Sequence, residues 1–192
     1  MDPWTHRRLE GTRVVLEPLE ERHREPLRAA ASDPEVFRFF THDLSQPEHF
    51  DAWFDLGRAE LTFATCVGGR PVGSSRYLSL APEHRRLEIG STWLARDRWQ
   101  TGTNVEAKYL MLDYAFAELG VRRVEFKTEA TNERSRAALA ALPAQFEGVH
   151  RNHMLVRGGE NRDSAWFSVI DAEWPQVRDA LRRRIARATS AA

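Results

Sequence analysis

Hydrophobic residues recur along this chain with two different periods, which predict strands and helices in a mixed order. Apolar runs, most of them alternating, predict strands over residues 13–19, 61–67, 72–80, 85–94, 121–130, 145–156 and 164–170. Helical spacing and capping signals predict helices over residues 21–31, 47–61, 103–119, 132–142 and 174–188. No repeat or low-complexity linker interrupts the pattern, so residues 1–192 are predicted to form a single domain. The order of elements predicts a mixed α/β fold: a central twisted sheet of about seven strands, flanked by helices and followed by a C-terminal helix.

The helix predicted over residues 103–119 has the longest periodic pattern. Four apolar residues recur at intervals of four, three and four and are predicted to share one buried face: Val105, Tyr109, Leu112 and Phe116. Gly120 follows where a left-handed C-terminal cap is expected. Because this helix joins strands 85–94 and 121–130, the two strands are predicted to be parallel. Gly90 interrupts the first of them and predicts a bulge or a close backbone approach.

Composition and charge exclude several classes of protein. With 28 basic and 28 acidic side chains the net charge is +0, so no specific nucleic-acid partner is expected, and any anion must meet a local site. The mean hydropathy is -0.55 and the apolar runs are short, so neither export nor a membrane association is supported. Cys66 is the only cysteine, which excludes an intramolecular disulfide and a cysteine-pair zinc site. A cytoplasmic location is the expectation.

The segment WLARDRWQTGTNVEAK, residues 93–108, has the form of an anion site. A strand ends, a short polar loop with Gly102 follows, and a helix begins, so free backbone N–H groups converge at the positive end of a helix dipole. Thr101 and Thr103 add hydroxyl donors. An ordinary strand-to-helix turn is an equally good interpretation of these residues alone. The motif is neither a dinucleotide fingerprint nor a Walker loop, which disfavours nicotinamide and ATP.

Together with TEATNERSRAAL and FEGVHRNHM further on, this segment resembles the GNAT superfamily of acetyl-CoA-dependent N-acetyltransferases, in its RimJ/RimL-like branch. The resemblance extends from LEGTRVVLEPL to EWPQV and implies the GNAT fold, with acetyl-CoA as cosubstrate. In that family the pyrophosphate of coenzyme A binds the loop Q/R-x-x-G-x-G/A; here Asn104 replaces a usual glycine or alanine. The implied cofactor-binding residues of the loop are Gln100, Thr101, Gly102, Thr103 and Asn104. Trp93 and Leu94 would contact pantetheine through their main chain, and Lys108 would either reach phosphate or be a solvated helix side chain.

Asn132 and Ser135 match the family motif N-x-x-S/A at the start of a helix. The resemblance implies that Asn132 binds the pantetheine arm and that Ser135 lies near the thioester sulfur, while the residues alone predict a helix cap and a first-turn serine. Leu139 stands where many members have an acidic tyrosine, which leaves Ser135 or water as the proton donor. Glu88 is implied to take a proton from the amine, usually through water; an exposed strand carboxylate is the alternative.

The implied reaction is transfer of acetyl to a primary amine by direct attack in a ternary complex, without a metal. The expected amine-binding residues lie in the loop between the first two helices and in the strands after residue 145: Phe39, Phe40, His42, His150, Arg151 and His153. His150 and His153 are three apart, and on a regular strand they would point to opposite faces, so no metal site is expected there.

Alternatives remain open for the acceptor and for turnover itself. A protein N-terminal α-amine is modestly favoured, because roughly a tenth of such groups is unprotonated at neutral pH, against under about a thousandth of lysine side chains. A non-catalytic acyl-CoA-binding sensor or scaffold is the alternative function. The identity of the acyl group and the choice between monomer and homodimer are open as well.

Overall fold

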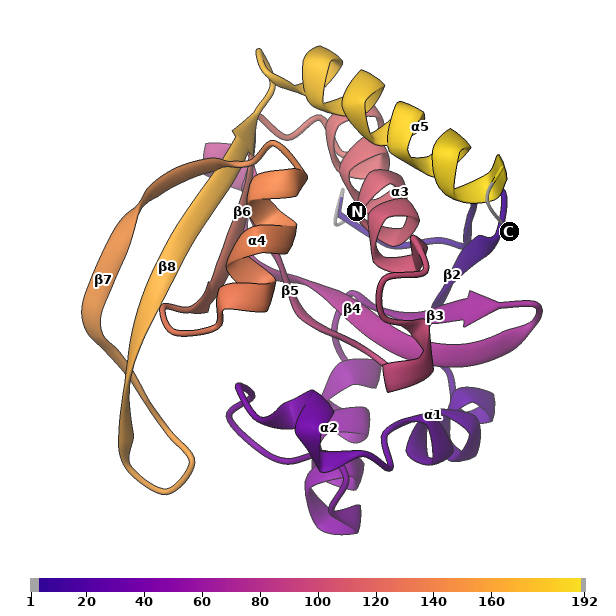
Figure 1. The fold of residues 1–192 in the computed structure, drawn as a ribbon, viewed down its shortest axis with the longest axis vertical. Coiled ribbons are helices and arrows are strands. Elements are labelled where there is room, and N and C mark those ends of the chain that lie inside the picture. The colour runs from indigo at the N-terminus through magenta and orange to yellow at the C-terminus, as the bar shows by residue number, and fades with distance from the viewer. Residues whose placement is uncertain (1–3, 191–192) are drawn as a thin grey trace.

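The structure, a computed structural model, describes residues 4–190. One sheet of eight strands runs in the order β1-β2-β3-β4-β5-β6-β8-β7 (Figure 1). The strands are β1 (Leu9–Glu10), β2 (Val14–Pro18), β3 (Thr62–Val67), β4 (Arg70–Ala81), β5 (Arg86–Leu94), β6 (Arg123–Glu129), β7 (Gln145–Val156) and β8 (Glu160–Ile170). The mixed α/β class is confirmed. The eighth strand, β1, has two residues, too few for an alternating pattern to reveal it.

The α-helices are α1 (Arg24–Ala30), α2 (Pro47–Arg58), α3 (Thr103–Ala117), α4 (Glu133–Ala141) and α5 (Trp174–Ser190). Short 3-10 helices are η1 (Glu21–His23), η2 (Pro34–Phe37), η3 (Pro82–His84) and η4 (Arg96–Arg98). The helix predicted over residues 21–31 is thus η1 followed by α1, and the one predicted over residues 47–61 ends at Arg58. Within residues 4–190, no helix has the length and apolar character needed to cross a membrane.

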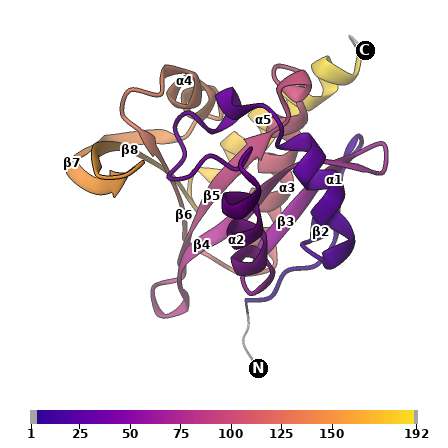
Figure 2. The ribbon, with the colours of Figure 1, turned by 90° about the horizontal axis from the view of Figure 1, so that it is seen from below.

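Helices cover both faces of the sheet, and each face has its own hydrophobic core. Helices α3, α4 and α5 cover one face, where the core includes Leu87, Met111 and Phe126. Helices α1 and α2 lie on the other face, where Phe50, Phe54 and others pack together (Figures 1 and 2). Every strand between these layers is therefore buried on two sides, and polar side chains inside the sheet need partners within the protein.

Helix α3 is buried on two sides, and the apolar face that the spacing predicts packs against the core but is only partly buried. Leu112 is fully buried, but Val105, Tyr109 and Phe116 are only half-buried. Two of these rings pack against Trp174 of α5, with centroids 5.2 Å apart for Phe116 and 6.4 Å for Tyr109. The side turned to the sheet contains polar residues among apolar ones and consists of Glu106, Ala107, Lys108, Met111 and Ala115. Because this side contains charged residues, the spacing of hydrophobic residues does not indicate it. The spacing indicates the side of α3 that packs against α5.

Strands β5 and β6 are parallel, as the crossover through α3 predicts, but they pair only at their beginnings. Their ladder joins residues 86–88 to residues 123–125 and then stops. Beyond it, β5 continues beside β4 and β6 continues beside β8 (Figure 1). The backbones therefore separate in the middle of the sheet, and main-chain groups of β5 that point toward β6 have no strand partner there.

A bulge in β5 lies where the two strands separate. Ser74 pairs with Trp93 and Arg76 pairs with Gly90, so two residues of β5 oppose the single Ser75. A Cβ added at Gly90 would lie 2.9 Å from Glu88 Oε1, and Ser91 has a φ of 47°. Both expectations for Gly90, a bulge and a close approach, are confirmed.

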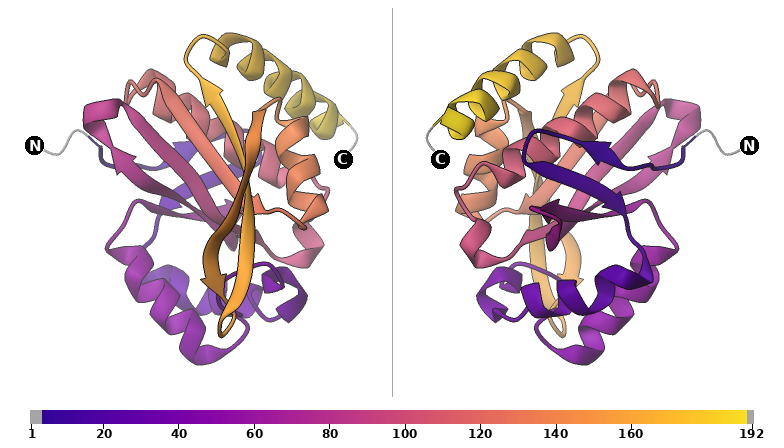
Figure 3. Two further views of the ribbon diagram at one scale, coloured as in Figure 1. Left: turned by 90° about the vertical axis from the view of Figure 1, so that its left-hand side faces the viewer. Right: turned by 90° about the vertical axis from the view of Figure 1, so that its right-hand side faces the viewer.

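The long β7–β8 hairpin reaches from the sheet to the segment between the first helices (Figure 3). At its turn Arg157 donates a hydrogen bond to the carbonyl oxygen of Phe40 at 3.4 Å and two to the carboxylate of Glu129. The hairpin thus ties the edge of the sheet to residues 37–40 across the face that carries α1 and α2.

Candidate active site

The loop before α3 forms an open helix N-terminus. Gly102 is the N-cap residue with a φ of 86°, and Gln100 has a φ of 61°, so the chain turns sharply through left-handed conformations. Gly102 has no side chain to cap the helix, and the backbone N–H of Thr103 donates a long hydrogen bond to Thr101 Oγ1 at 3.4 Å. The hydroxyls of Thr101 and Thr103 are 2.8 Å apart, and the guanidinium of Arg13 lies 2.7 Å from where a Cβ of residue 102 would be. Backbone N–H groups at a helix start, hydroxyls and a nearby cation are what a phosphate site requires.

The two β5 residues expected to contact pantetheine already have main-chain or side-chain partners. Trp93 is buried, and its ring packs edge-on against Phe37 and Trp53. The carbonyl oxygen of Leu94 accepts a hydrogen bond from Trp99 Nε1 at 3.0 Å. The guanidinium of Arg134 lies 3.5 Å from the centre of the Trp99 ring, so this side chain links α4 to the loop before α3. The sequence carries no signal for this contact, because it joins residues far apart in the chain.

Asn132 caps α4, as predicted. Its Oδ1 accepts a hydrogen bond from the backbone N–H of Ser135 at 3.0 Å, and 8% of the residue is exposed. Asn132 lines a cleft of about 310 Å³ between the start of α4 and the chain after η2, which also contains Phe39. Leu139 is buried in the core under α3 and, being a hydrocarbon side chain, cannot supply the acid that a tyrosine would. Ser135 is half-buried in the first turn of α4.

Lys108 is neither solvated nor directed to the loop, which corrects both expectations for it. Only 5% of the residue is exposed, and its Nζ donates hydrogen bonds to Thr92 Oγ1 at 2.5 Å and to Ser75 Oγ at 3.1 Å. Burial lowers its pKa from 10.5 to about 7, opposed by the charge of Glu88. The reason is its register on α3: it lies on the side turned to the sheet, at the bulge of β5, rather than at the phosphate end. Asn104, in contrast, remains in the first turn, with a buried Oδ1 that has no hydrogen-bond partner among the described residues.

Glu88 is buried, so the alternative of an exposed strand carboxylate is wrong. It is 1% exposed and is the last β5 residue paired with β6. Its Oε2 accepts hydrogen bonds from Ser79 Oγ at 3.1 Å and Lys127 Nζ at 3.2 Å. The Glu88 side chain is on the face opposite α3, because its neighbours Leu87 and Ile89 belong to the core under that helix.

His150 and His153 point to the same face, so the prediction that they diverge is wrong. His150 pairs with Ser164 and Met154 pairs with Arg162, so three residues of β7 oppose one of β8. This irregularity resets the alternation, and the two imidazole centroids are 5.7 Å apart. Both rings pack on Trp166, at 4.9 and 5.7 Å, and His153 Nδ1 lies 3.0 Å from Ser164 Oγ. Burial, helped by the charge of Lys127, lowers the pKa of His153.

Trp166 connects these histidines to Glu88. Lys127, the partner of Glu88, pairs with Trp166 across the β6–β8 ladder, and its Nζ lies 5.5 Å from the ring centroid. We call this set the polar cluster; it consists of Glu88, Lys127, His150, His153 and Trp166. The other expected amine-binding residues lie outside it. Phe39 lines the cleft at Asn132, the Phe40 carbonyl receives Arg157, and His42 and Arg151 are exposed.

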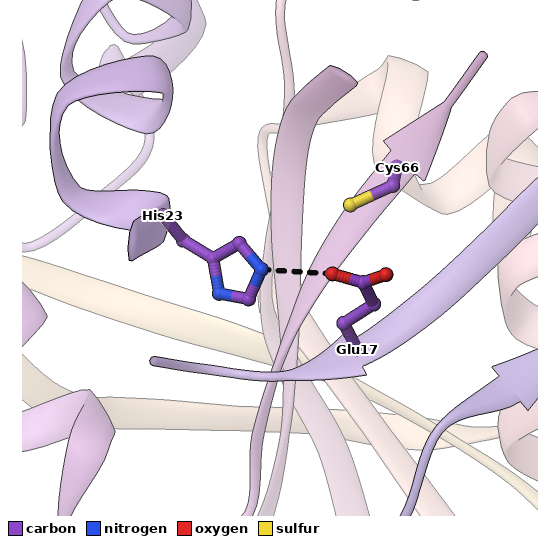
Figure 4. Close-up of side chains that lie close together, drawn as sticks. All are labelled: Glu17, His23 and Cys66. Atoms are coloured by element: carbon purple, nitrogen blue, oxygen red, sulfur yellow. Dashed lines mark hydrogen bonds and ion pairs between the residues drawn. The ribbon is translucent and has the colours of Figure 1, made fainter. Parts of the chain in front are cut away.

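A second group of ligand-type side chains lies between β2, η1 and β3 (Figure 4). The backbone N–H of Glu20 donates to His23 Nδ1, so Nε2 carries the proton and donates to Glu17 Oε2 at 2.9 Å. Burial raises the pKa of the Cys66 thiol to about 11. Both imidazole nitrogens of His23 are thus engaged, and the protonated Cys66 thiol donates to the carbonyl oxygen of Ala64 at 3.9 Å. His23 and Glu17 form a hydrogen-bonded structural pair, and Cys66 is the buried strand residue that was predicted.

Comparisons with known proteins identify the family. Residues 13–144 match the model of the acetyltransferase (GNAT) domain. The chain is 26% identical over 176 residues to the uncharacterized N-acetyltransferase YoaA of Bacillus subtilis. The aligned region covers 84% of this chain and 96% of YoaA. A GCN5-related N-acetyltransferase from Brucella melitensis has a TM-score of 0.87 at 32% identity, over 96% of this chain and 90% of that chain. Fold and relatives define an acetyltransferase. The chain belongs to the GNAT family, as its resemblance implied.

The branch within the family is a separate question. Mycobacterium smegmatis RimJ, solved in complex with CoA-disulfide, has a TM-score of 0.73 at 22% identity, over 95% of this chain and 96% of that chain. A likeness at this identity shows a shared fold. Membership of the RimJ/RimL-like branch stays a prediction.

Proposed function

We propose that this protein is an acetyl-CoA-dependent N-acetyltransferase of the RimJ/RimL-like branch, a cytoplasmic enzyme that acetylates a primary amine. The observation that supports it most is the place of Glu88. This buried carboxylate is the last residue of the β5–β6 ladder, at the point where the two strands separate. A base there can take a proton from an amine on the face of α1 and α2, while the opposite face presents the start of α3 and of α4.

The residues around the two helix starts fit coenzyme A. The α3 N-terminus offers the backbone N–H groups that follow Thr103 in its first turn, and the guanidinium of Arg13 lies beside Gly102 as a cation. Thr101, Thr103 and Asn104 add polar side-chain atoms, and the Asn132 amide nitrogen remains available because only its Oδ1 is used in the cap. When bound, acetyl-CoA would supply the activated acyl carbon.

Protein groups would then divide the proton transfers. Glu88 accepts the proton of the amine, directly or through a water, and Lys127 and Ser79 hold its carboxylate in place. Backbone N–H groups of β5 beyond the ladder are available to hydrogen-bond the carbonyl oxygen. Ser135, in the first turn of α4, or a water beside it, gives a proton to the departing thiolate. Direct attack needs no covalent enzyme intermediate and no metal.

A simple experiment separates this function from that of a non-catalytic acyl-CoA sensor. Saturating acetyl-CoA is expected to raise the melting temperature, because a ligand at about a hundred times its dissociation constant stabilises the native state by roughly 2.7 kcal/mol. The enzyme should also release CoA thiol in the presence of peptides with a free N-terminus or small amines. A thermal shift without thiol release from any amine would favour the sensor, and no shift would contradict the cofactor assignment.

The phosphate site can be tested with Gly102→Ala. The substitution forces a Cβ into a left-handed conformation, next to Arg13 and Ala188, and should lower stability by about 1–2 kcal/mol. We expect the affinity for acetyl-CoA, measured by calorimetry on the folded variant, to fall at least 10-fold in addition.

Gly120→Ala is the matched control at the other end of α3. Gly120 also has a positive φ, 63°, and a Cβ there would approach only Arg85 at 3.7 Å. It should lose similar stability and keep the affinity for acetyl-CoA. If both variants bind acetyl-CoA equally well, the pyrophosphate binds elsewhere.

A further inference from the structure

Arg162 is a buried arginine whose guanidinium has no polar partner in the part of the chain that the structure describes. It lies on β8, opposite Met154 of β7, and is 9% exposed. Its Nε has no hydrogen-bond partner, and its guanidinium takes part in no ion pair among residues 4–190. Burial lowers its pKa, but not enough to remove the charge of a guanidinium. An unpaired buried charge is among the most costly features a fold can contain.

Other arginines with an unpaired buried Nε do not share this property. Four of them have another carboxylate or carbonyl contact: Arg13 with Glu106 and Ala188, Arg76 with Glu60, Arg98 with Asp97, and Arg178 with Asp179. In Arg76 and Arg98 a terminal guanidinium nitrogen makes the ion pair. In Arg13 and Arg178 the Nε itself lies 3.8 and 3.9 Å from a carboxylate oxygen, too far for a hydrogen bond but close enough for an ion pair. Arg162 alone among these five has its whole guanidinium free, so a structural ion pair does not explain it.

The two carboxylates whose charge acts on Arg162, Glu129 and Glu88, are hydrogen-bonded to other cations. Glu129 accepts two hydrogen bonds from Arg157, at 3.0 and 3.2 Å, and Glu88 is paired with Lys127 at 3.2 Å. Both carboxylates act on Arg162 only through their field. Arg157 also binds Glu160 at 2.8 Å, so these carboxylates are held by Arg157 and Lys127. Arg162 is the cation of this group that no carboxylate of the described residues contacts directly, which leaves its guanidinium able to bind an anion.

Arg162 lies on the same face of the sheet as the proposed base. Along β8 the side chains of Arg162, Ser164 and Trp166 share one face, and Trp166 pairs with Lys127, the partner of Glu88. His153 is affected by the charges of both Glu88 and Arg162 and lies with Trp166 in the polar cluster. A molecule on this face could contact the carboxylate at one end and the guanidinium at the other.

We propose, on the basis of the function proposed above, that the acceptor is a small amine that also carries a carboxylate or phosphate group, and that Arg162 binds this anionic group. A planar guanidinium can form two parallel hydrogen bonds to either anion. Glu88 would face the amino group, and the rings of His150, His153 and Trp166 would lie along the chain between the two charged ends. Arg162 then determines specificity for the acceptor.

The experiment compares matched acceptors with the full-length enzyme and acetyl-CoA. Amino acids and ω-amino acids of increasing length are paired with their amides, and 2-aminoethyl phosphate is paired with ethanolamine. The wild type should favour the anionic member of at least one pair about 10- to 100-fold in kcat/KM. The length of the best ω-amino acid reports the distance between base and guanidinium, and the phosphate pair distinguishes the two anions.

Arg162→Leu should remove this preference, mainly through a higher KM for the anionic acceptor, and should change the rate with its amide far less. Because it removes an unpaired buried charge, it should melt at the same temperature as the wild type or higher. Arg183→Leu, a change of an exposed α5 arginine, is the control for losing one positive charge. Equal rates for acids and amides, a preference that survives Arg162→Leu, or a peptide N-terminus preferred independently of Arg162 would overturn the proposal.

A second measurement does not depend on turnover. In ¹H–¹⁵N spectra the Arg162 Nε–H signal, identified by its loss in Arg162→Lys, should shift when 4-aminobutyrate, glutamate or 2-aminoethyl phosphate is added, and not with the matched neutral amines. An unchanged signal with all anionic probes overturns the proposal even if the enzyme acetylates neutral amines. A shift without any acetyl transfer would instead support the anion site and contradict the proposed function.

Discussion

Lys108→Met is expected to stabilise the folded chain by roughly 3 kcal/mol at pH 6. Burial lowers the pKa of Lys108 from 10.5 to about 7. At about 1.36 kcal/mol per unit, holding the protonated form in the fold costs about 5 kcal/mol, from which we subtract about 2 for the lost hydrogen bonds to Ser75 and Thr92. These two hydroxyls lie 2.6 Å apart and can still bond each other. Methionine fills nearly the same volume without a charge.

The stabilisation should depend on pH in a defined direction. Below about pH 7 Lys108 is protonated in both the folded and the unfolded chain, and the full cost of burying its charge is present. Between about 7 and 10.5 the unfolded chain binds a proton that the folded chain has released, so wild-type stability rises with pH. Above that window both states are neutral and the cost disappears. The difference between variant and wild type should therefore be largest at pH 6 and shrink steadily toward pH 10.

Urea unfolding at pH 6 and pH 9.5 measures this difference, with Lys127→Met as the control. Lys127 is the other lysine of the chain and is ion-paired to Glu88, so its removal leaves a buried carboxylate unpaired and should destabilise the fold. A Lys108→Met protein that is less stable than the wild type at pH 6, or a difference that does not change with pH, would contradict the desolvation of this amine.

The order of elements could be predicted because it depends on local patterns. Strands 86–94 and 123–129, the capping Asn132 and the left-handed Gly120 follow from alternation, helix capping and glycine placement, each a short-range effect. The hydrophobic pattern indicates the side of α3 that packs against α5 and misses the more deeply buried side, because Glu106 and Lys108 lie there. Charged side chains with partners inside the fold are invisible to a hydrophobic pattern, and only the tertiary contacts reveal them.

The candidate site could be predicted only where it coincides with a local motif. The loop around Gly102 and the start of α4 carry recognisable patterns. The orientation of His150 and His153 depends on an irregularity of the β7–β8 ladder, which no short stretch of sequence indicates. Arg162 is one of many arginines in the chain, and what distinguishes it is the lack of a partner after folding. Properties of this kind arise from long-range packing and need the structure.

Glu88→Gln is expected to lower kcat/KM by about 100-fold or more at pH 6, where nearly all of an amine with a pKa near 8 is protonated. Glutamine keeps the shape of the side chain and can still accept from Ser79, but it cannot accept a proton. As the pH rises, free amine forms without help from the enzyme. The defect should therefore decrease progressively and fall to about 10-fold or less above pH 9.

Glu125→Gln is the matched control for this prediction. Glu125 pairs directly with Glu88 across the β5–β6 ladder and is also buried, but Arg86 and Arg123 hold its carboxylate away from the polar cluster. Its removal should affect stability and leave the pH profile of kcat/KM unchanged. Initial rates across pH 6–9.5, with the dissociation constant for acetyl-CoA measured in parallel, distinguish the two variants. If Glu88→Gln loses the same factor at every pH, the carboxylate only holds Lys127 and β5 in place, and the amine loses its proton to solvent before it attacks.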